Sequence, residues 1–137
     1  MITPDMYMDR CYVSVTGLSA KDWFSMPKFL RLSRRACREA LKAEGNVYSS
    51  TFTYNGIRFI ITAWESRDAQ EEFFSDEAHV DVIESMKQVS SYAKVHEYFA
   101  NRLPLAGKAI NEWKKDGRRI YGEPKEKCGD MVPKECW

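Results

Sequence analysis

Hydrophobic and polar residues alternate in four stretches of this 137-residue chain. This alternation predicts four β-strands, at residues 11–18, 47–54, 57–65 and 92–99. Only Asn55 and Gly56 separate the second stretch from the third, and both residue types accept the positive φ angles of a two-residue hairpin turn. We therefore expect residues 47–54 and 57–65 to form an antiparallel β-hairpin.

The segments between these strands repeat apolar residues at three- and four-residue steps, which predicts amphipathic helices. The first helix should follow a cap at Ser25 and end near Ala43. The second should follow a cap at Ser66, occupy about residues 68–89 and restart after an interruption at residues 75–76. We also expect a short helix at residues 106–115, a short extra strand at 118–121 and a polar tail at 122–137.

The resulting order of elements is βαββαβ, which is the ferredoxin-like α+β arrangement. It predicts an antiparallel four-stranded sheet with helices on one face, an extra C-terminal helix, and one domain at residues 1–121 before the tail.

The two faces of this sheet are expected to differ. An apolar set should meet the helices: Val13, Val15, Phe52, Phe59, Ile61, Val95 and Phe99. The opposite set mixes aromatic and polar side chains: Tyr12, Ser14, Thr16, Ser49, Thr51, Thr53, Ile60, Thr62, Trp64, Tyr92, His96 and Tyr98. Because packing the mixed face against a second copy removes a large aromatic patch from water, we expect a homodimer that closes one α+β barrel.

Charge and composition narrow the class of protein. The 21 Lys and Arg residues nearly cancel the 20 Asp and Glu residues, so no long-range field favours nucleic acid, and the basic side of the first helix is best explained as a solvated face. No apolar run is long enough to span a membrane, and the N-terminus does not resemble a signal peptide. These features predict a soluble, cytoplasmic protein.

The four cysteines do not form a recognisable metal or disulfide pattern. They contain no Cys-x-x-Cys pair, and we expect Cys37 to be a core residue. A disulfide between Cys128 and Cys136 is not expected in a reducing compartment.

The run Thr-Ala-Trp-Glu-Ser-Arg-Asp-Ala-Gln-Glu-Glu-Phe-Phe-Ser-Asp-Glu-Ala-His follows a Gly-Asn-Val-Tyr strand and the Asn-Gly turn. With this context it resembles the dimeric α+β barrel superfamily, and within it the antibiotic-biosynthesis-monooxygenase group. The Trp-x-Ser pattern and the Ala-His pair are also similar to spheroidene-monooxygenase-like proteins. The resemblance covers about residues 12–99 and is more specific for fold than for chemistry.

The resemblance implies several site positions. In a cyclase member that closes a polyketide ring, a His and a Tyr on the second helix act together. The His matches His79, whereas Phe73 stands at the Tyr position and has no hydroxyl. In haem-degrading members, an Asn, a Trp and a His serve. They fall near Thr16, at Phe73 and approximately at His79. In cofactor-independent quinone-forming members, a Trp and an Asn near the pocket help an electron-rich substrate react with oxygen, and Trp64 can take the part of the Trp.

The chemistry of the residues agrees that His79 is the leading catalytic candidate. Its place near a helix start favours a neutral imidazole, which can accept a proton from a phenol or bind a haem iron. The alternative is a buried histidine that only packs. Trp64 and Phe73 are candidates to stack a flat substrate, and Tyr92, His96, Thr16 and Phe29 to complete its pocket, although core or dimer packing explains each of them as well.

These observations predict a monooxygenase-like oxidation of a small, mostly apolar aromatic or polyene substrate between the sheet and the second helix, with haem or without any cofactor. A cyclase or isomerase, and a non-catalytic small-molecule-binding dimer, are the alternatives.

Overall fold

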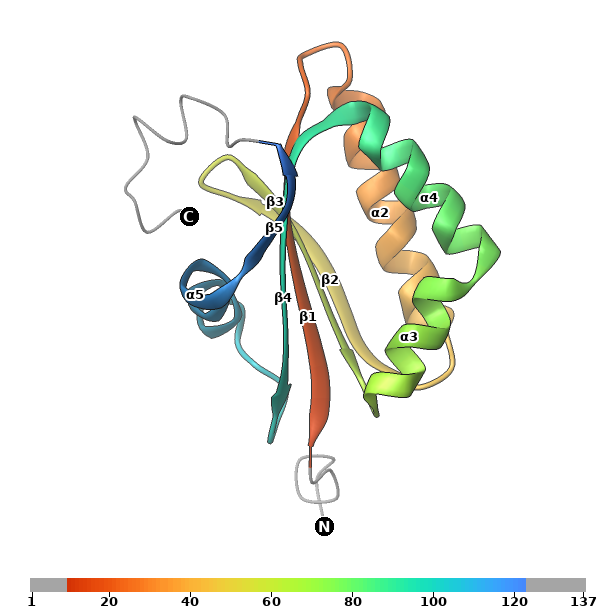
Figure 1. The fold of residues 1–137 in the computed structure, drawn as a ribbon, viewed down its shortest axis with the longest axis vertical. Helices are drawn as coiled ribbons and strands as arrows, with labels where there is room; N and C mark the ends of the chain where they lie inside the picture. Colours follow the sequence, from red (N-terminus) through yellow and green to blue (C-terminus); the bar gives the residue numbers. More distant parts are fainter. Residues whose placement is uncertain (1–9, 123–137) are drawn as a thin grey trace.

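The computed structural model describes residues 10–122, which form five strands and four helices (Figure 1). In chain order these are β1 (Cys11–Ala20), α2 (Met26–Lys42), β2 (Asn46–Tyr54), β3 (Ile57–Trp64), α3 (Arg67–Ser75), α4 (Glu77–Val89), β4 (Ser90–Ala100), α5 (Ala106–Asp116) and β5 (Arg118–Gly122). Within this range, no helix has the length and apolar character that crossing a membrane requires. Of the predicted tail, Gly122 belongs to β5 and the rest, with Cys128 and Cys136, lies outside the described residues. Cys11 and Cys37 are buried.

Local sequence signals place the turn and the helix break. Asn55 and Gly56 adopt φ angles of 51° and 81°, as expected for the hairpin turn. Ser66 caps α3, because its hydroxyl oxygen accepts a 3.1 Å hydrogen bond from the backbone N–H of Ala69. Asp76 is extended and separates α3 from α4 at the predicted interruption. Ser25 occupies the N-cap position of α2, as predicted, but its side chain makes no capping hydrogen bond.

The sheet is antiparallel with the order β2-β3-β1-β4-β5. The first four strands reproduce the ferredoxin-like order, but the predicted total of four strands is wrong because β5 pairs with β4 and makes a fifth. Tyr121 fixes this added strand: it lies opposite Ala93, and its hydroxyl shares a short hydrogen bond with the hydroxyl of Ser90.

The assignment of the two sheet faces is wrong in the sequence prediction. Figure 1 shows α2, α3 and α4 on one side of the sheet and α5 on the other. The face with Val13, Val15 and Phe59 packs against α5, whereas the mixed face lies under the three earlier helices. The error also affected β4, because His96 and Tyr98 lie opposite Val15 and Val13 and therefore share the α5 face, while Val95 pairs with Thr16 on the helix-covered face.

Trp113 anchors α5 on the apolar face and is fully buried. Its ring meets Phe59 edge-on at a centroid distance of 4.9 Å, and its indole N–H donates a 2.7 Å hydrogen bond to the carbonyl of Lys94. Gly17 makes room for this ring, since a Cβ atom at Gly17 would lie 2.4 Å from Trp113 Cζ2. The apolar face therefore belongs to a core of its own, separate from the space under α2–α4.

Candidate functional site

A cavity of about 300 Å³ lies between the mixed face of the sheet and helices α2, α3 and α4. Its floor comes from β1, β3, β4 and β5, and apolar side chains form most of its wall. Two charged, exposed residues, Lys87 and Glu97, also line it. A small apolar space with few polar groups is the usual form of a small-molecule site.

His79 is the buried titratable group of this cavity and is 6% exposed. Its ring packs against Phe73 and Phe74, with centroid distances of 4.2 and 5.2 Å. The Nδ1 atom is buried and has no hydrogen-bond partner among the described residues. Burial lowers the pKa of His79 below the ordinary 6.5, so the imidazole is neutral at pH 7. The neutral form expected from the sequence is thus supported, with desolvation as the main cause.

Two carboxylates oppose this desolvation. Glu39 on α2 and Asp76 at the helix break each raise the pKa of His79, and Glu39 has the larger effect. One oxygen of Glu39 pairs with Arg35 at 2.9 Å, while the other is buried without a partner in the described part of the chain. A proton gained by His79 would therefore meet a nearby negative charge.

A second polar group of the cavity, Glu97, was missed by the sequence reasoning. Its carboxylate accepts a 3.0 Å hydrogen bond from the Tyr12 hydroxyl and a 2.7 Å bond from the Gln70 amide. Burial and this bond raise the pKa of Tyr12 to about 12, so Tyr12 remains a donor at neutral pH. Only the β1–β4 register, which sets Glu97 opposite Ser14, could have placed this residue on the cavity face.

Three of the predicted site residues line the cavity together: His79, Phe73 and Thr16. Trp64 is fully buried behind Phe73, with ring centroids 5.1 Å apart, and its indole N–H donates to the Thr62 hydroxyl. It therefore supports the wall without lining the space.

The other predicted site residues do not reach the cavity. Phe29 is a core residue of α2, packed in the cluster under α4. Tyr92 packs in the core beneath α5, and His96 lies on that same opposite face of the sheet. The prediction that His96 helps to complete the pocket is therefore wrong, because the strand register places His96 on the α5 face.

The residues of the cavity do not fit haem. A histidine that ligates a metal usually donates its other ring N–H to a carbonyl or carboxylate, and Nδ1 of His79 has no such partner in residues 10–122. The volume of about 300 Å³ lies at the lower limit of ligand pockets, where a one- or two-ring molecule fits and a porphyrin does not.

Comparison with known proteins identifies the fold. No protein-family model and no curated protein sequence matches the chain. Among solved structures, a candidate antibiotic biosynthesis monooxygenase from Deinococcus radiodurans aligns with a TM-score of 0.62 and 15% identity, over 69% of this chain and 96% of that one. The chain shares the fold of this protein.

Two further structures share this fold. A candidate antibiotic biosynthesis monooxygenase from Nitrosomonas europaea gives a TM-score of 0.60 at 13% identity, over 66% of this chain and 89% of that one. SnoaB, a cofactor-independent oxygenase from Streptomyces nogalater, gives 0.55 at 10% identity, over 72% and 97%. At these identities the likeness concerns the fold, and the chemistry has to be argued from the cavity.

Proposed function

We propose that the protein catalyses a monooxygenase-like oxidation of a small aromatic substrate, best represented by a phenol, without a bound cofactor. The observation that supports this proposal most directly is the state of His79, a neutral, buried imidazole beside an apolar cavity of ligand size. Its Nδ1 atom has no hydrogen-bond partner within residues 10–122. A phenolic hydroxyl is the kind of group such a nitrogen can bind.

The proposed reaction begins with a proton transfer. The phenol ring packs against Phe73 and Phe74, and His79 accepts the hydroxyl proton. Glu39 and Asp76, which raise the pKa of His79, stabilise the resulting imidazolium. The phenolate is electron-rich and reacts with molecular oxygen. One oxygen atom enters the ring as the second carbonyl of a quinone, and the other leaves as water with the two displaced hydrogens. The substrate supplies all the electrons, so no external reductant is needed.

The proposal is tested with an oxygen electrode and a panel of one- and two-ring phenols, on purified full-length protein without added cofactor. We expect oxygen uptake with quinone formation, and its loss in His79→Phe, which keeps a ring but removes the base. Val80→Ala is the matched control, because Val80 is the neighbouring side chain on α4 and is exposed. Binding of phenols without oxygen uptake would refute the oxidation and favour a carrier. A His79-dependent Soret band on addition of haem would refute the cofactor-free mechanism.

We also propose that the protein is a homodimer. The mixed face, expected from the sequence to form the interface, is covered by α2–α4, so the proposed interface is the opposite face, which carries α5. Tyr48, Phe52 and Tyr54 project from β2 on this face, and the two tyrosines are 37% and 48% exposed. Packing this aromatic row against a second copy would remove it from water. Sedimentation equilibrium that reports a monomer at all concentrations would refute this proposal.

A further inference from the structure

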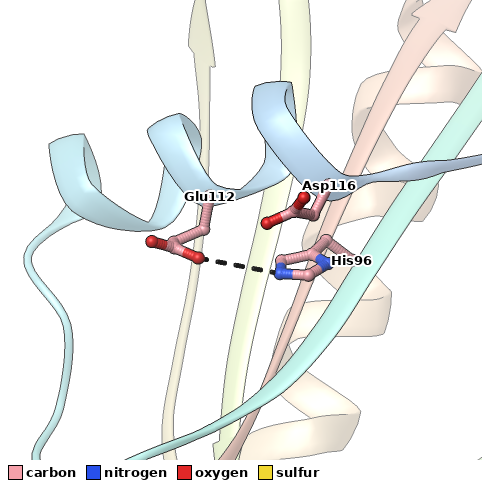
Figure 2. Close-up of side chains that lie close together, drawn as sticks. All are labelled: His96, Glu112 and Asp116. Carbon is pink, nitrogen blue, oxygen red and sulfur yellow. Dashed lines mark ion pairs between the residues drawn. The ribbon is translucent and has the colours of Figure 1, made fainter.

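A cluster of metal-ligand residues lies on the opposite side of the sheet from the cavity. Figure 2 shows Glu112 and Asp116 projecting from α5 toward His96 on β4. The potential ligand atoms of the three side chains lie within 4.8 Å of one another, and His96 Nε2 is 4.0 Å from Glu112 Oε2. That separation fits an ion pair when His96 is protonated but is too long for a hydrogen bond, so Glu112 does not occupy the lone pair of His96 Nε2.

The helix presents its two carboxylates at an electrostatic cost. Glu112 and Asp116 are one helical turn apart, so their like charges repel on the same face. Glu112 lies one turn earlier, whereas Asp116 lies in the last turn of α5, where the helix dipole disfavours negative charge. Lys114 and Lys115 share that turn and offset part of the dipole effect. A cation held between the carboxylates would remove their mutual repulsion.

The histidine is held in a defined orientation. The ring of Tyr98 stacks on His96 at a centroid distance of 5.1 Å and an interplanar angle of 20°, and the His96 side chain is 14% exposed. His96 and Asp116 also border a hollow of about 360 Å³, which gives an ion access to the cluster. Arg118 lines the same hollow and would limit the affinity.

We propose that His96, Glu112 and Asp116 form a binding site for a divalent first-row transition ion. One imidazole nitrogen and two carboxylates suit Mn²⁺ and Zn²⁺, and three protein ligands leave further positions for water. Such an ion would join the end of α5 to β4 across the face opposite the cavity. The site is independent of the proposed oxidation and of His79.

The test is a titration of the full-length, tag-free protein with Mn²⁺. Binding is measured as the loss of the EPR signal of free Mn²⁺. Mn²⁺ is chosen because the thiolates of the four cysteines favour softer ions. We expect one saturable site per chain and a rise in melting temperature with Mn²⁺. His96→Gln and Asp116→Asn should each weaken Mn²⁺ binding by at least about tenfold to a hundredfold. This is the loss typical when a residue that hydrogen-bonds a metal ligand is removed, and removing the ligand itself should cost no less.

Two variants serve as controls for this experiment. Asp81→Asn removes an exposed carboxylate on α4, and His79→Gln removes the only other histidine, so both should bind Mn²⁺ like the wild type. Circular dichroism is used to check that each variant is folded. Asp116→Asn should not disturb the fold, because the side chain of Asp116 is exposed. The proposal is overturned if the wild type binds no Mn²⁺ at millimolar concentration. It is equally overturned if both ligand variants bind unchanged, or if Asp81→Asn weakens binding as much as they do.

Discussion

Protonation of His79 should destabilise the folded protein on mild acidification. Burial lowers the pKa of His79 in the folded state, whereas the unfolded chain keeps the ordinary 6.5. Between these two values the unfolded chain holds a proton that the folded protein does not. The stability contributed by the neutral imidazole is therefore fully present above pH 6.5 and is lost as the pH falls toward the folded-state pKa.

The size of this loss follows from the titration. If the folded protein stays unprotonated, the free energy of unfolding falls by about 1.4 kcal/mol between about pH 7.5 and about pH 5.5. Replacing His79 by Phe keeps a ring against Phe73 and Phe74 and should remove this pH dependence. The chain has two histidines, so the variant His96→Gln measures separately how much of the pH dependence of stability comes from the other histidine.

The assay is urea denaturation followed by circular dichroism at pH 7.5, 6.5 and 5.5, a range that stays above the titration of ordinary carboxylates. The wild type and His96→Gln should both lose stability on acidification relative to His79→Phe. Parallel pH profiles for all three proteins would show that His79 titrates alike in the folded and unfolded states, and the account of its desolvation would then be wrong.

Two other perturbations test the cores on either side of the sheet. Gly17→Ala should lower the free energy of unfolding by about 1–3 kcal/mol, because its Cβ would overlap the Trp113 ring, and by much less in a Trp113→Leu background. A double-mutant cycle by urea denaturation measures this, and equal costs in both backgrounds would contradict it. Glu39→Gln should lower the pKa of His79 further, since the charge of Glu39 raises it; an NMR titration of His79 that finds the same or a higher value would count against that role.

Local chemistry made much of the fold predictable. Asn55 and Gly56 specified the hairpin turn, because few other residue pairs accept two successive positive φ angles. Ser66 and the 75–76 interruption placed the boundaries of α3 and α4. The three- and four-residue spacing of His79, Val82, Met86 and Val89 puts His79 on the helix face that meets the sheet, and the structure places it in the cavity. These features depend on short stretches of chain, which a sequence contains in full.

The pairing of distant surfaces was not predictable in this way. Alternation within β4 correctly grouped Tyr92, His96 and Tyr98 on one face, but it carries no information about which face of β1 they join. That depends on the register between strands separated by some eighty positions, which also decides that Glu97 reaches the cavity.

The sequence by itself determined the order of the elements, the turn, the helix break and the orientation of His79, because each follows from neighbouring residues. Only the tertiary structure decided which helix covers which face. The apolar face could be buried by any helix with an apolar side. It packs against α5 because the Trp113 ring fits over Gly17. That choice leaves the mixed face beneath α2–α4, where its polar groups and His79 surround a small cavity.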